Sequence, residues 1–144
     1  PTDTQEPWLF KLDIGTGKLV ERFPTPDGGG IHGIEWDDGL MWLTAFEPRA
    51  LVLVDPKDLR VLKKFPSDLD ILHGIALDGA GIWCAERNGK RIVKYNVESG
   101  EELDRITFPG DGPDPHGLAI KDGVLWYSDA GKPSGKPEIG KIIR

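Results

Sequence analysis

The stretch HGIALDGAGIWCAE, residues 73–86, decides the fold, because its pattern occurs three times in the chain. Residues 32–42 read HGIEWDDGLMW, and residues 116–126 read HGLAIKDGVLW. The histidines of successive copies stand 41 and 43 residues apart, and so do the tryptophans of the three copies. A repeat period in the low forties with short strands is typical of the blades of a β-propeller. The pattern therefore predicts an all-β repeat fold.

A second sequence marker repeats with the same rhythm as the His-Gly segments. Three Phe-Pro dipeptides, at residues 23–24, 65–66 and 108–109, keep almost the same period. Each closes a pair of short segments rich in β-branched and aromatic residues and bounded by Gly, Pro, Asp or Asn, which is the pattern of a hairpin. The Asp-Gly dipeptides inside the His-Gly segments favour tight hairpin turns, because these residues tolerate a positive φ. Each blade is thus expected to have four antiparallel strands, of which the His-Gly strand is the innermost.

The number of blades does not fill a ring. We expect residues 1–7 to form a flexible head and residues 8–144 to form the propeller repeats. The repeats comprise a partial blade (8–23), two complete blades (31–65 and 73–108) and a second partial blade (116–144), about three and a quarter blades in all. Propellers close with roughly 4–8 blades. The ring is expected to be completed by missing sequence or by a second chain, and a homodimer with two-fold symmetry would give roughly six blades.

Composition excludes several classes of partner. The net charge of −6 disfavours nucleic acid, whose phosphates require clustered Lys and Arg, and the basic pairs Lys63-Lys64 and Lys90-Arg91 are expected to be solvated charges beside strands. The single cysteine, Cys84, forms no intrachain disulfide and is expected to be a small buried hydrophobe. No run approaches the roughly 18 apolar residues of a membrane helix. We therefore expect a soluble protein without a membrane partner, and the compartment stays open between the cytoplasm and a secreted or periplasmic location.

The repeated aromatic residues have two interpretations. Trp42, Trp83 and Trp126 occupy the same position in their copies. They could form stacking platforms for a ring-shaped ligand, but an identical large residue in every blade favours packing between neighbouring blades. The Phe-Pro pairs are expected to end the outermost strands, because proline cannot continue the hydrogen-bonded ladder.

The histidines are the candidate catalytic residues. His32, His73 and His116 begin the innermost strands, so they are expected to line the mouth of the central channel. Imidazole is a common metal ligand and titrates near neutral pH, which suits a metal site or proton transfer. The alternative is a repeated bond from each imidazole to the backbone of a neighbouring blade, which would make the histidines part of the blade architecture.

The carboxylates break the repetition. Glu86 and Asp129 stand three residues after the tryptophans of their copies, where the first copy has Ala45. Both are expected on the face that presents the histidines. In an antiparallel hairpin, the start of the first strand, with the histidine, lies beside the end of the second strand, with the acid. Carboxylate oxygens with imidazole nitrogens would suit zinc or manganese better than calcium, so we treat both acids as candidate metal ligands.

Residues in the loops on the same face complete the set. Asp70, Asp114 and Arg87 lie beside the first or second strand of a blade and are the candidate ligand-binding residues. An acidic rim around imidazoles could hold a divalent cation or a cationic ligand. The alternative is that these are ordinary solvated residues of surface loops.

The last copy, HGLAIKDGVLWYSD at residues 116–129, resembles the repeat of streptogramin B lyase (virginiamycin B lyase) and of the related NHL and SMP-30-type propellers. That lyase opens a cyclic depsipeptide by elimination, with a histidine and a magnesium site that has acidic ligands. The resemblance implies comparable roles for His116, Glu86 and Asp129, which match by position within the repeat only. The complete propeller of the lyase has more than twice as many blades as this chain.

We therefore expect a propeller that binds a small molecule or a divalent metal ion (Mg, Mn or Zn) at the channel mouth. If it is an enzyme, we expect metal-assisted lyase or hydrolase chemistry, although no serine stands in a nucleophile elbow. The rival hypothesis is a non-catalytic scaffold for protein–protein interaction. An enzyme should concentrate asymmetric polar residues at the channel, whereas a scaffold should expose a patch on its rim.

Overall fold

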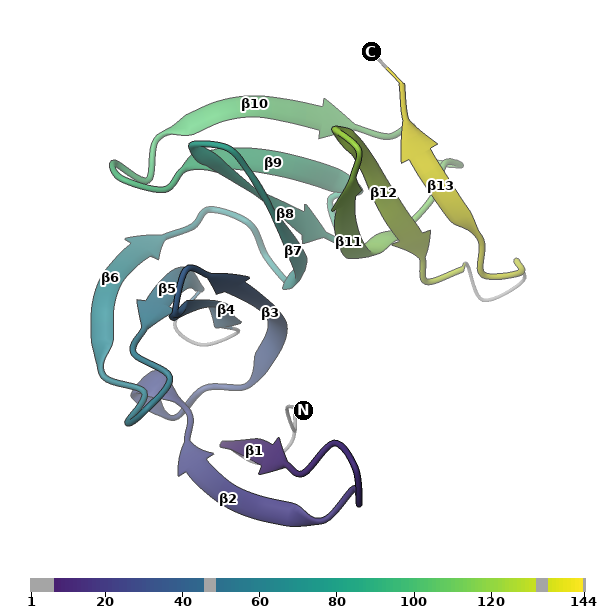
Figure 1. Cartoon of the computed structure of the whole chain (residues 1–144). Helices are drawn as coiled ribbons and strands as arrows, with labels where there is room; N and C mark the ends of the chain where they lie inside the picture. Colours follow the sequence, from purple (N-terminus) through teal and green to yellow (C-terminus); the bar gives the residue numbers. More distant parts are fainter. Residues whose placement is uncertain (1–6, 46–48, 132–134, 144) are drawn as a thin grey trace. The chain divides into compact units, whose positions relative to one another are not determined.

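The computed structural model describes residues 7–45, 49–131 and 135–143. The strands in these residues form four separate antiparallel sheets, and the helical structure is one short 3-10 turn, η1 (Pro26–Gly28) (Figure 1). The all-β class predicted from the repeat is confirmed. All but one residue of the expected N-terminal head (1–7) lie outside the described residues. The chain divides into two compact units, Pro1–Ser67 and Asp68–Arg144, and each is described by itself.

The first unit contains a two-stranded and a four-stranded sheet. The two-stranded sheet is the partial first blade, with β1 paired to β2. The four-stranded sheet has its strands in chain order, as expected for one blade. The strands are β1 (Trp8–Leu12), β2 (Leu19–Pro24), β3 (Ile31–Asp37), β4 (Leu40–Ala45), β5 (Ala50–Val54) and β6 (Val61–Pro66).

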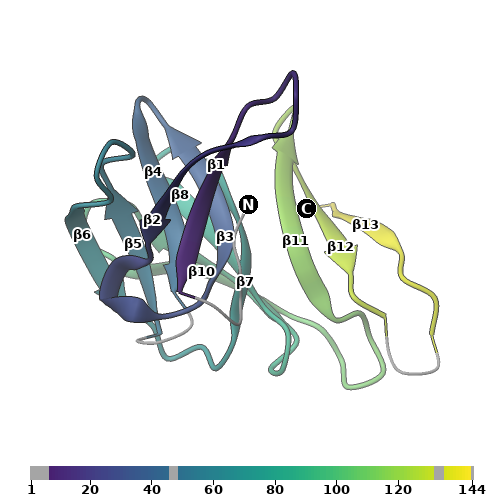
Figure 2. The same ribbon diagram turned by 90° about the horizontal axis from the view of Figure 1, so that it is seen from below.

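The second unit contains a four-stranded and a three-stranded sheet. The first is the middle blade, with its strands again in chain order, and the second is the last blade, whose strands β11, β12 and β13 follow one another in Figure 2. The strands are β7 (Leu72–Asp78), β8 (Gly81–Glu86), β9 (Arg91–Asn96), β10 (Glu102–Thr107), β11 (Pro115–Lys121), β12 (Val124–Asp129) and β13 (Ile139–Ile142). The predicted two, four, four and three strands are thus confirmed.

The Asp-Gly turns form as expected in two of the three copies. Asp38 and Gly39 have φ of 43° and 87°, and Asp122 and Gly123 have φ of 52° and 74°. Positive φ at both central residues gives a turn whose twist matches that of the flanking strands. In the middle copy the Asp-Gly dipeptide stands one position earlier, so Asp78 ends β7. The two-residue turn keeps its repeat position and is formed by Gly79, at φ 61°, and Ala80.

Each unit has an apolar core between two of its sheets. In the first unit, Leu9 and Phe23 of the two-stranded sheet join a cluster built mainly by the four-stranded sheet, including Leu43 and Val52. In the second unit, Trp83 and Ile92 of the middle blade pack with Leu125 of the last blade. Side chains of adjacent sheets therefore fill the space between blades, as close packing of stacked sheets requires.

Two of the three tryptophans of the repeat, Trp42 and Trp83, are packing residues, whereas Trp126 is 36% exposed. Trp42 is 1% exposed and Trp83 is 5% exposed, whereas Trp36, which is outside that repeat position, is 61% exposed. The indole Nε1–H of Trp42 donates to Asp37 at 2.9 Å, and that of Trp83 donates to Asp78 at 3.0 Å. The acid at the end of the innermost strand thus satisfies the one polar atom of the buried ring, which favours the packing interpretation over a stacking platform.

Candidate functional site

The His-Gly dipeptide forms a β-bulge in every copy. The register shifts between Ile31 and Ile34 in the first unit, and in the second unit it shifts in the same way at the starts of β7 and β11. A bulge leaves a residue out of the ladder and redirects its side chain. The sequence places a histidine at this point in all three copies, and the bulge therefore fixes the direction of the imidazole.

In two of the three copies, a side-chain hydroxyl accepts a hydrogen bond from the backbone N–H of the glycine in the bulge. The backbone N–H of Gly33 donates to Thr44 Oγ1 at 2.6 Å, and that of Gly117 donates to Ser128 Oγ at 2.8 Å. The middle copy has Ala85 at the same repeat position. Sequence reasoning missed these two hydroxyls, although a hydroxyl residue two positions after the tryptophan was a visible signal.

Gly74 brings the middle and last blades together. A Cβ atom placed on this residue would lie 2.6 Å from the carbonyl oxygen of His116 and 2.7 Å from the Cα of Gly117. Only glycine allows the backbone of β7 to approach β11 this closely. Gly74 therefore permits the close approach of the two backbones.

The close approach brings two imidazole rings together. The ring centroids of His73 and His116 lie 3.9 Å apart, with 32° between the ring planes. His73 is 5% exposed, whereas His116 is partly exposed. His32 occupies the equivalent bulge in the first unit, and it is described with that unit alone. Of the three candidate catalytic histidines, the second unit thus brings two into direct contact.

The environment of His116 keeps its imidazole neutral. Burial lowers the pKa of His116 below its ordinary value of 6.5, and the positive charge of Arg87 lowers it further. Arg87 follows β8 directly, is exposed, and begins a turn in which its carbonyl accepts a hydrogen bond from Lys90 N–H at 3.1 Å. A neutral imidazole beside a guanidinium combines a proton acceptor with a donor for an anionic oxygen.

Glu86 is fully buried, and its bonds serve the fold. Its Oε1 accepts the backbone N–H of Gly89 at 2.7 Å, and its Oε2 accepts Arg91 Nε at 2.7 Å and Arg91 Nη2 at 2.5 Å. A carboxylate that neutralises a guanidinium and holds a turn does not suit a metal ion, because Arg91 would repel the cation. The candidate metal role of Glu86 is therefore not supported by its surroundings.

Asp129 and Asp114 hold the loops around the start of β11. Oδ1 of Asp129 accepts the backbone N–H groups of Asp114 and Gly131, both at 2.9 Å. Oδ1 of Asp114 lies 2.8 Å from Lys90 Nζ, which also donates to the carbonyl of Gly112 at 2.8 Å. These bonds join the turn after β8 to the loop before β11.

The expectation for Lys90 and Arg91 is wrong. The side chains of Lys90 and Arg91 are 18% and 26% exposed, and both form ion pairs instead of being solvated charges. Both residues lie at the end of the middle blade where the loops converge, so carboxylates from elsewhere in the chain can reach them. Asp70 at the same end accepts a hydrogen bond from Asn88 Nδ2 at 3.0 Å.

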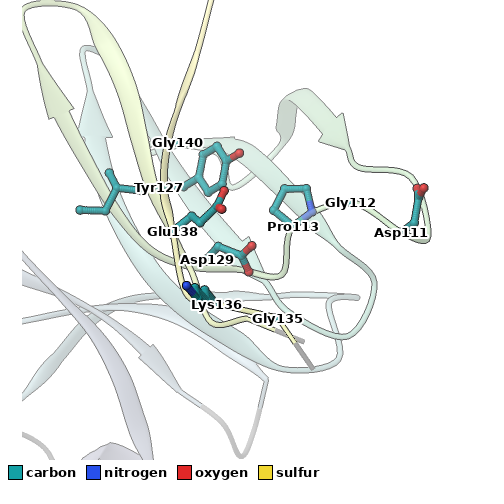
Figure 3. A pocket seen from close by; sticks show the side chains of 10 residues that line it. Asp111, Gly112, Pro113, Tyr127, Asp129, Gly135, Lys136, Glu138 and Gly140 are labelled. Atoms are coloured by element: carbon teal, nitrogen blue, oxygen red, sulfur yellow. The ribbon is translucent and has the colours of Figure 1, made fainter. Parts of the chain in front are cut away.

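A cavity of about 350 Å³ opens beside Asp129 in the last blade (Figure 3). Asp129 is paired with Pro115 in the sheet, so the cavity lies at the end of β11 that carries His116. Its walls include Asp111, Tyr127, Glu138 and Lys136. Burial raises the pKa of Tyr127, and the charges of Asp129 and Glu138 raise it further, so the phenol stays protonated.

Two further findings bear on the expected chemistry. Within residues 7–45, 49–131 and 135–143, no three His, Cys, Asp or Glu side chains gather in a group that could hold a metal ion. Cys84 is fully buried, and burial, followed by the charge of Glu86, raises its pKa, so it remains an unreactive thiol. The predicted role of Cys84 as a small buried hydrophobe is confirmed.

Comparison with known structures identifies the fold. A chain of a nidogen/laminin complex matches with a TM-score of 0.70 and 19% identity, over 96% of this chain and 55% of that one. Streptogramin B lyase matches with a TM-score of 0.66 and 16% identity, over 95% and 48% of the two chains. Virginiamycin B lyase from Staphylococcus aureus matches with a TM-score of 0.66 and 17% identity, over 96% and 50%.

The chain has a β-propeller fold. Its blades resemble those of streptogramin B lyase, as the sequence repeat predicted, and it spans about half the length of the propellers that it matches. No protein-family model and no curated protein matches the sequence. In the described part of the propeller, no helix has both the length and the apolar character needed to cross a membrane.

Proposed function

We propose that this propeller binds a small molecule bearing a carbonyl or carboxylate oxygen at the end of the second unit that carries His73, His116 and Arg87. The observation that carries this proposal is the close pair of imidazole rings, in which burial and then the charge of Arg87 lower the pKa of the more exposed ring, that of His116. Arg87 would bind the oxygen of the ligand, and His116 would accept a hydrogen bond or a proton. The cavity beside Asp129 offers room for a small molecule at the same end of the last blade.

The same groups suit elimination or hydrolysis of an ester. In an elimination, His116 would take a proton from the carbon next to the one that bears the ester oxygen. The electrons of that carbon–hydrogen bond would form a carbon–carbon double bond, and the carbon–oxygen bond would break as the carboxylate leaves. Arg87 would stabilise the negative charge that develops on oxygen. His73 would act as a positioning residue, because its buried ring packs against that of His116. The similarity in fold to streptogramin B lyase supports a cyclic ester as the first substrate to test.

Imidazole NMR tests the binding site directly. The chain has three histidines, so their ring resonances can be followed individually during titrations with benzoate, inorganic phosphate and a streptogramin B. We expect at least one probe to shift the resonances of His73 and His116 but not those of His32. Arg87→Gln should abolish the shifts, while the control Arg22→Gln in the first unit should not. Unshifted His73 and His116 resonances with every probe would reject the site.

Catalysis is tested separately from binding. Ring opening of a streptogramin B is followed by mass spectrometry, with and without added Mg²⁺. Loss of a general base slows a reaction by roughly 10²–10⁴-fold, and we expect this from His116→Gln. If binding is observed but no product forms, the protein is a binding module without lyase activity.

Metal binding at this end stays a prediction. Glu86 already neutralises Arg91, so we assign no step of the proposed chemistry to a metal ion. Calorimetric titration of chelator-treated protein with Zn²⁺, Mn²⁺ and Mg²⁺ tests the prediction. A true site should lose affinity as the pH falls through the histidine range and in Asp129→Asn, because protonated imidazole cannot ligate.

We also propose that the chain associates with a second copy of itself. The supporting observation is the exposure of Trp126, which is 36% exposed although its repeat equivalents are buried. Tryptophan is enriched at the core of protein–protein interfaces. Light scattering at micromolar concentration should give the mass of a dimer, and the mass of one chain would refute this second proposal.

A further inference from the structure

The second unit contains one complete example of the contact between blades. Trp83 on β8 packs against Leu125 on β12, with Leu118 and Ile120 of β11 beside it. The tryptophan comes from the second strand of one blade, and the apolar receiving residues come from the inner hairpin of the next blade. We call the surface around the tryptophan, here Trp83, the donor face. We call the apolar residues that it packs against, here Leu118, Ile120 and Leu125, the receiving pocket.

The first unit has a receiving pocket that is open. Ile34, Trp36 and Met41 occupy the repeat positions of Leu118, Ile120 and Leu125. Ile34 is 40% exposed and Trp36 is 61% exposed, whereas Leu125 is 6% exposed. These three residues line a cavity of about 480 Å³. Its remaining apolar walls are formed by Leu9, Phe10, Phe23, Pro56 and Leu59.

The last blade has a donor face that is equally open. Trp126 stands at the repeat position of Trp83 and is 36% exposed, against 5% for Trp83. Lys141 Nζ lies 5.9 Å from the centroid of the Trp126 ring, as Lys94 Nζ lies 5.5 Å from that of Trp83. The donor face is therefore formed in the same way as in the complete contact, and what it lacks is a receiving pocket.

We infer that the donor face of the last blade, centred on Trp126, docks into the receiving pocket formed by Ile34, Trp36 and Met41 of a second copy. This inference rests on the proposed self-association and specifies its surface. The occupant is a second copy because the chain carries both halves of one repeated contact, each open, and the complete contact at Trp83 shows that such halves fit each other. Two copies can form this contact twice under two-fold symmetry, which doubles the buried area.

The innermost edge of the partial first blade adds to this surface. Among the described strands, β1 pairs with β2 alone, so its other edge keeps unpaired backbone groups beside the pocket. Such an edge favours pairing with another strand. In the last blade β12 is already paired with β13, for example at Trp126 and Lys141. The β1 strand of a second copy could therefore pair with β12 only if it displaced β13. The contact of Trp126 with the pocket does not require that exchange.

The test is the dimerisation constant of charged variants, measured by sedimentation equilibrium. Trp126→Glu and Trp36→Glu each place a carboxylate in the contact, and both residues are exposed enough for the single chain to fold, which circular dichroism verifies. Each should weaken dimerisation about 30-fold or more, as for the loss of a central aromatic residue in an interface. Leu103→Glu, at a 51% exposed position on the outer strand β10, is the matched control and should leave the constant unchanged.

Mixing the two variants gives the decisive result. A Trp126→Glu chain keeps its receiving pocket, and a Trp36→Glu chain keeps its donor face, so the pair retains one intact contact of two. We expect the mixture to form more dimer than either variant alone. A wild-type monomer would refute the self-association itself. A wild-type dimer that both variants leave unchanged, or a mixture no better than its components, would preserve the self-association and overturn this surface.

Discussion

The middle and last blades place the same repeat positions in different environments. Trp83 and Glu86 in the middle blade are 5% and 0% exposed, whereas Trp126 in the last blade is 36% exposed and Asp129 borders an open cavity. The local sequences are closely similar, so the difference comes from what packs against each sheet. The side chain at a given repeat position therefore points the same way in each blade, but its burial depends on the blade that packs against it.

The largest expected difference concerns the tryptophans. Trp83→Ala should lower the free energy of unfolding by roughly 3–5 kcal/mol, because it removes a buried aromatic side chain and leaves a cavity. Trp126→Ala should cost about 0.5 kcal/mol or less in the monomer, as for other surface positions. Urea unfolding of both variants measures the difference. Equal losses would mean that the last blade is packed as tightly as the middle one.

The next difference concerns the carboxylates. Glu86→Ala should cost roughly 3–5 kcal/mol, because it leaves the partly buried guanidinium of Arg91 without its partner. Asp129→Ala should cost about 1–3 kcal/mol, because two backbone N–H groups lose their acceptor. Thermal and urea unfolding check the order of the two. A smaller loss from Glu86→Ala would show that the ion pair with Arg91 is not required for the fold.

A smaller effect is expected at the bulge. Ser128→Ala removes the hydroxyl that accepts the N–H of Gly117 and should cost about 0.5–1.5 kcal/mol. The middle blade has Ala85 at this position, which shows that the bulge forms without a hydroxyl. Ser128→Thr keeps the acceptor and serves as the control. If Ser128→Ala is as stable as the wild type, the hydroxyl has no role in the bulge.

The smallest effect is the dependence on pH. The pKa of His116 is lowered below 6.5 by burial and by Arg87, so the folded protein binds fewer protons at this group than the unfolded chain. The stability contributed by neutral His116 is present above its unfolded pKa of about 6.5 and is lost as the pH falls through the lowered folded pKa. Unfolding at several pH values should show a decline on acidification that His116→Gln reduces, and identical pH profiles would contradict the shift.

Much of the fold could be predicted from the repeat. The period of the His-Gly and Phe-Pro markers gave the strand count in each sheet, and the strands ended near the expected prolines at Pro24 and Pro66. Such predictions succeed because strand alternation, turn residues and proline act over a few neighbouring residues. The turn after Asp78 has different residues, because the Asp-Gly dipeptide of the middle copy stands one position earlier and Gly79 and Ala80 form the two-residue turn.

The candidate site was predicted less completely. The sequence correctly placed Glu86 and the histidines near the same end of their hairpins, but it could not show that Arg91 neutralises Glu86 or that Lys90 pairs with Asp114. These contacts join residues on different strands and loops, and their partners depend on side-chain direction and distance. The contact of His73 with His116 also depends on how closely Gly74 lets β7 approach β11.

The sequence by itself determined the all-β class, the blade repeat, two of the three Asp-Gly turns and the position of a histidine at the start of each innermost strand. These features follow from short-range rules of backbone conformation that each copy satisfies independently. The tertiary structure alone decided which repeated residues are buried, which acids are neutralised and which imidazoles touch. Burial and pKa depend on the atoms that surround a group, and those atoms come from other blades whose approach no local pattern specifies.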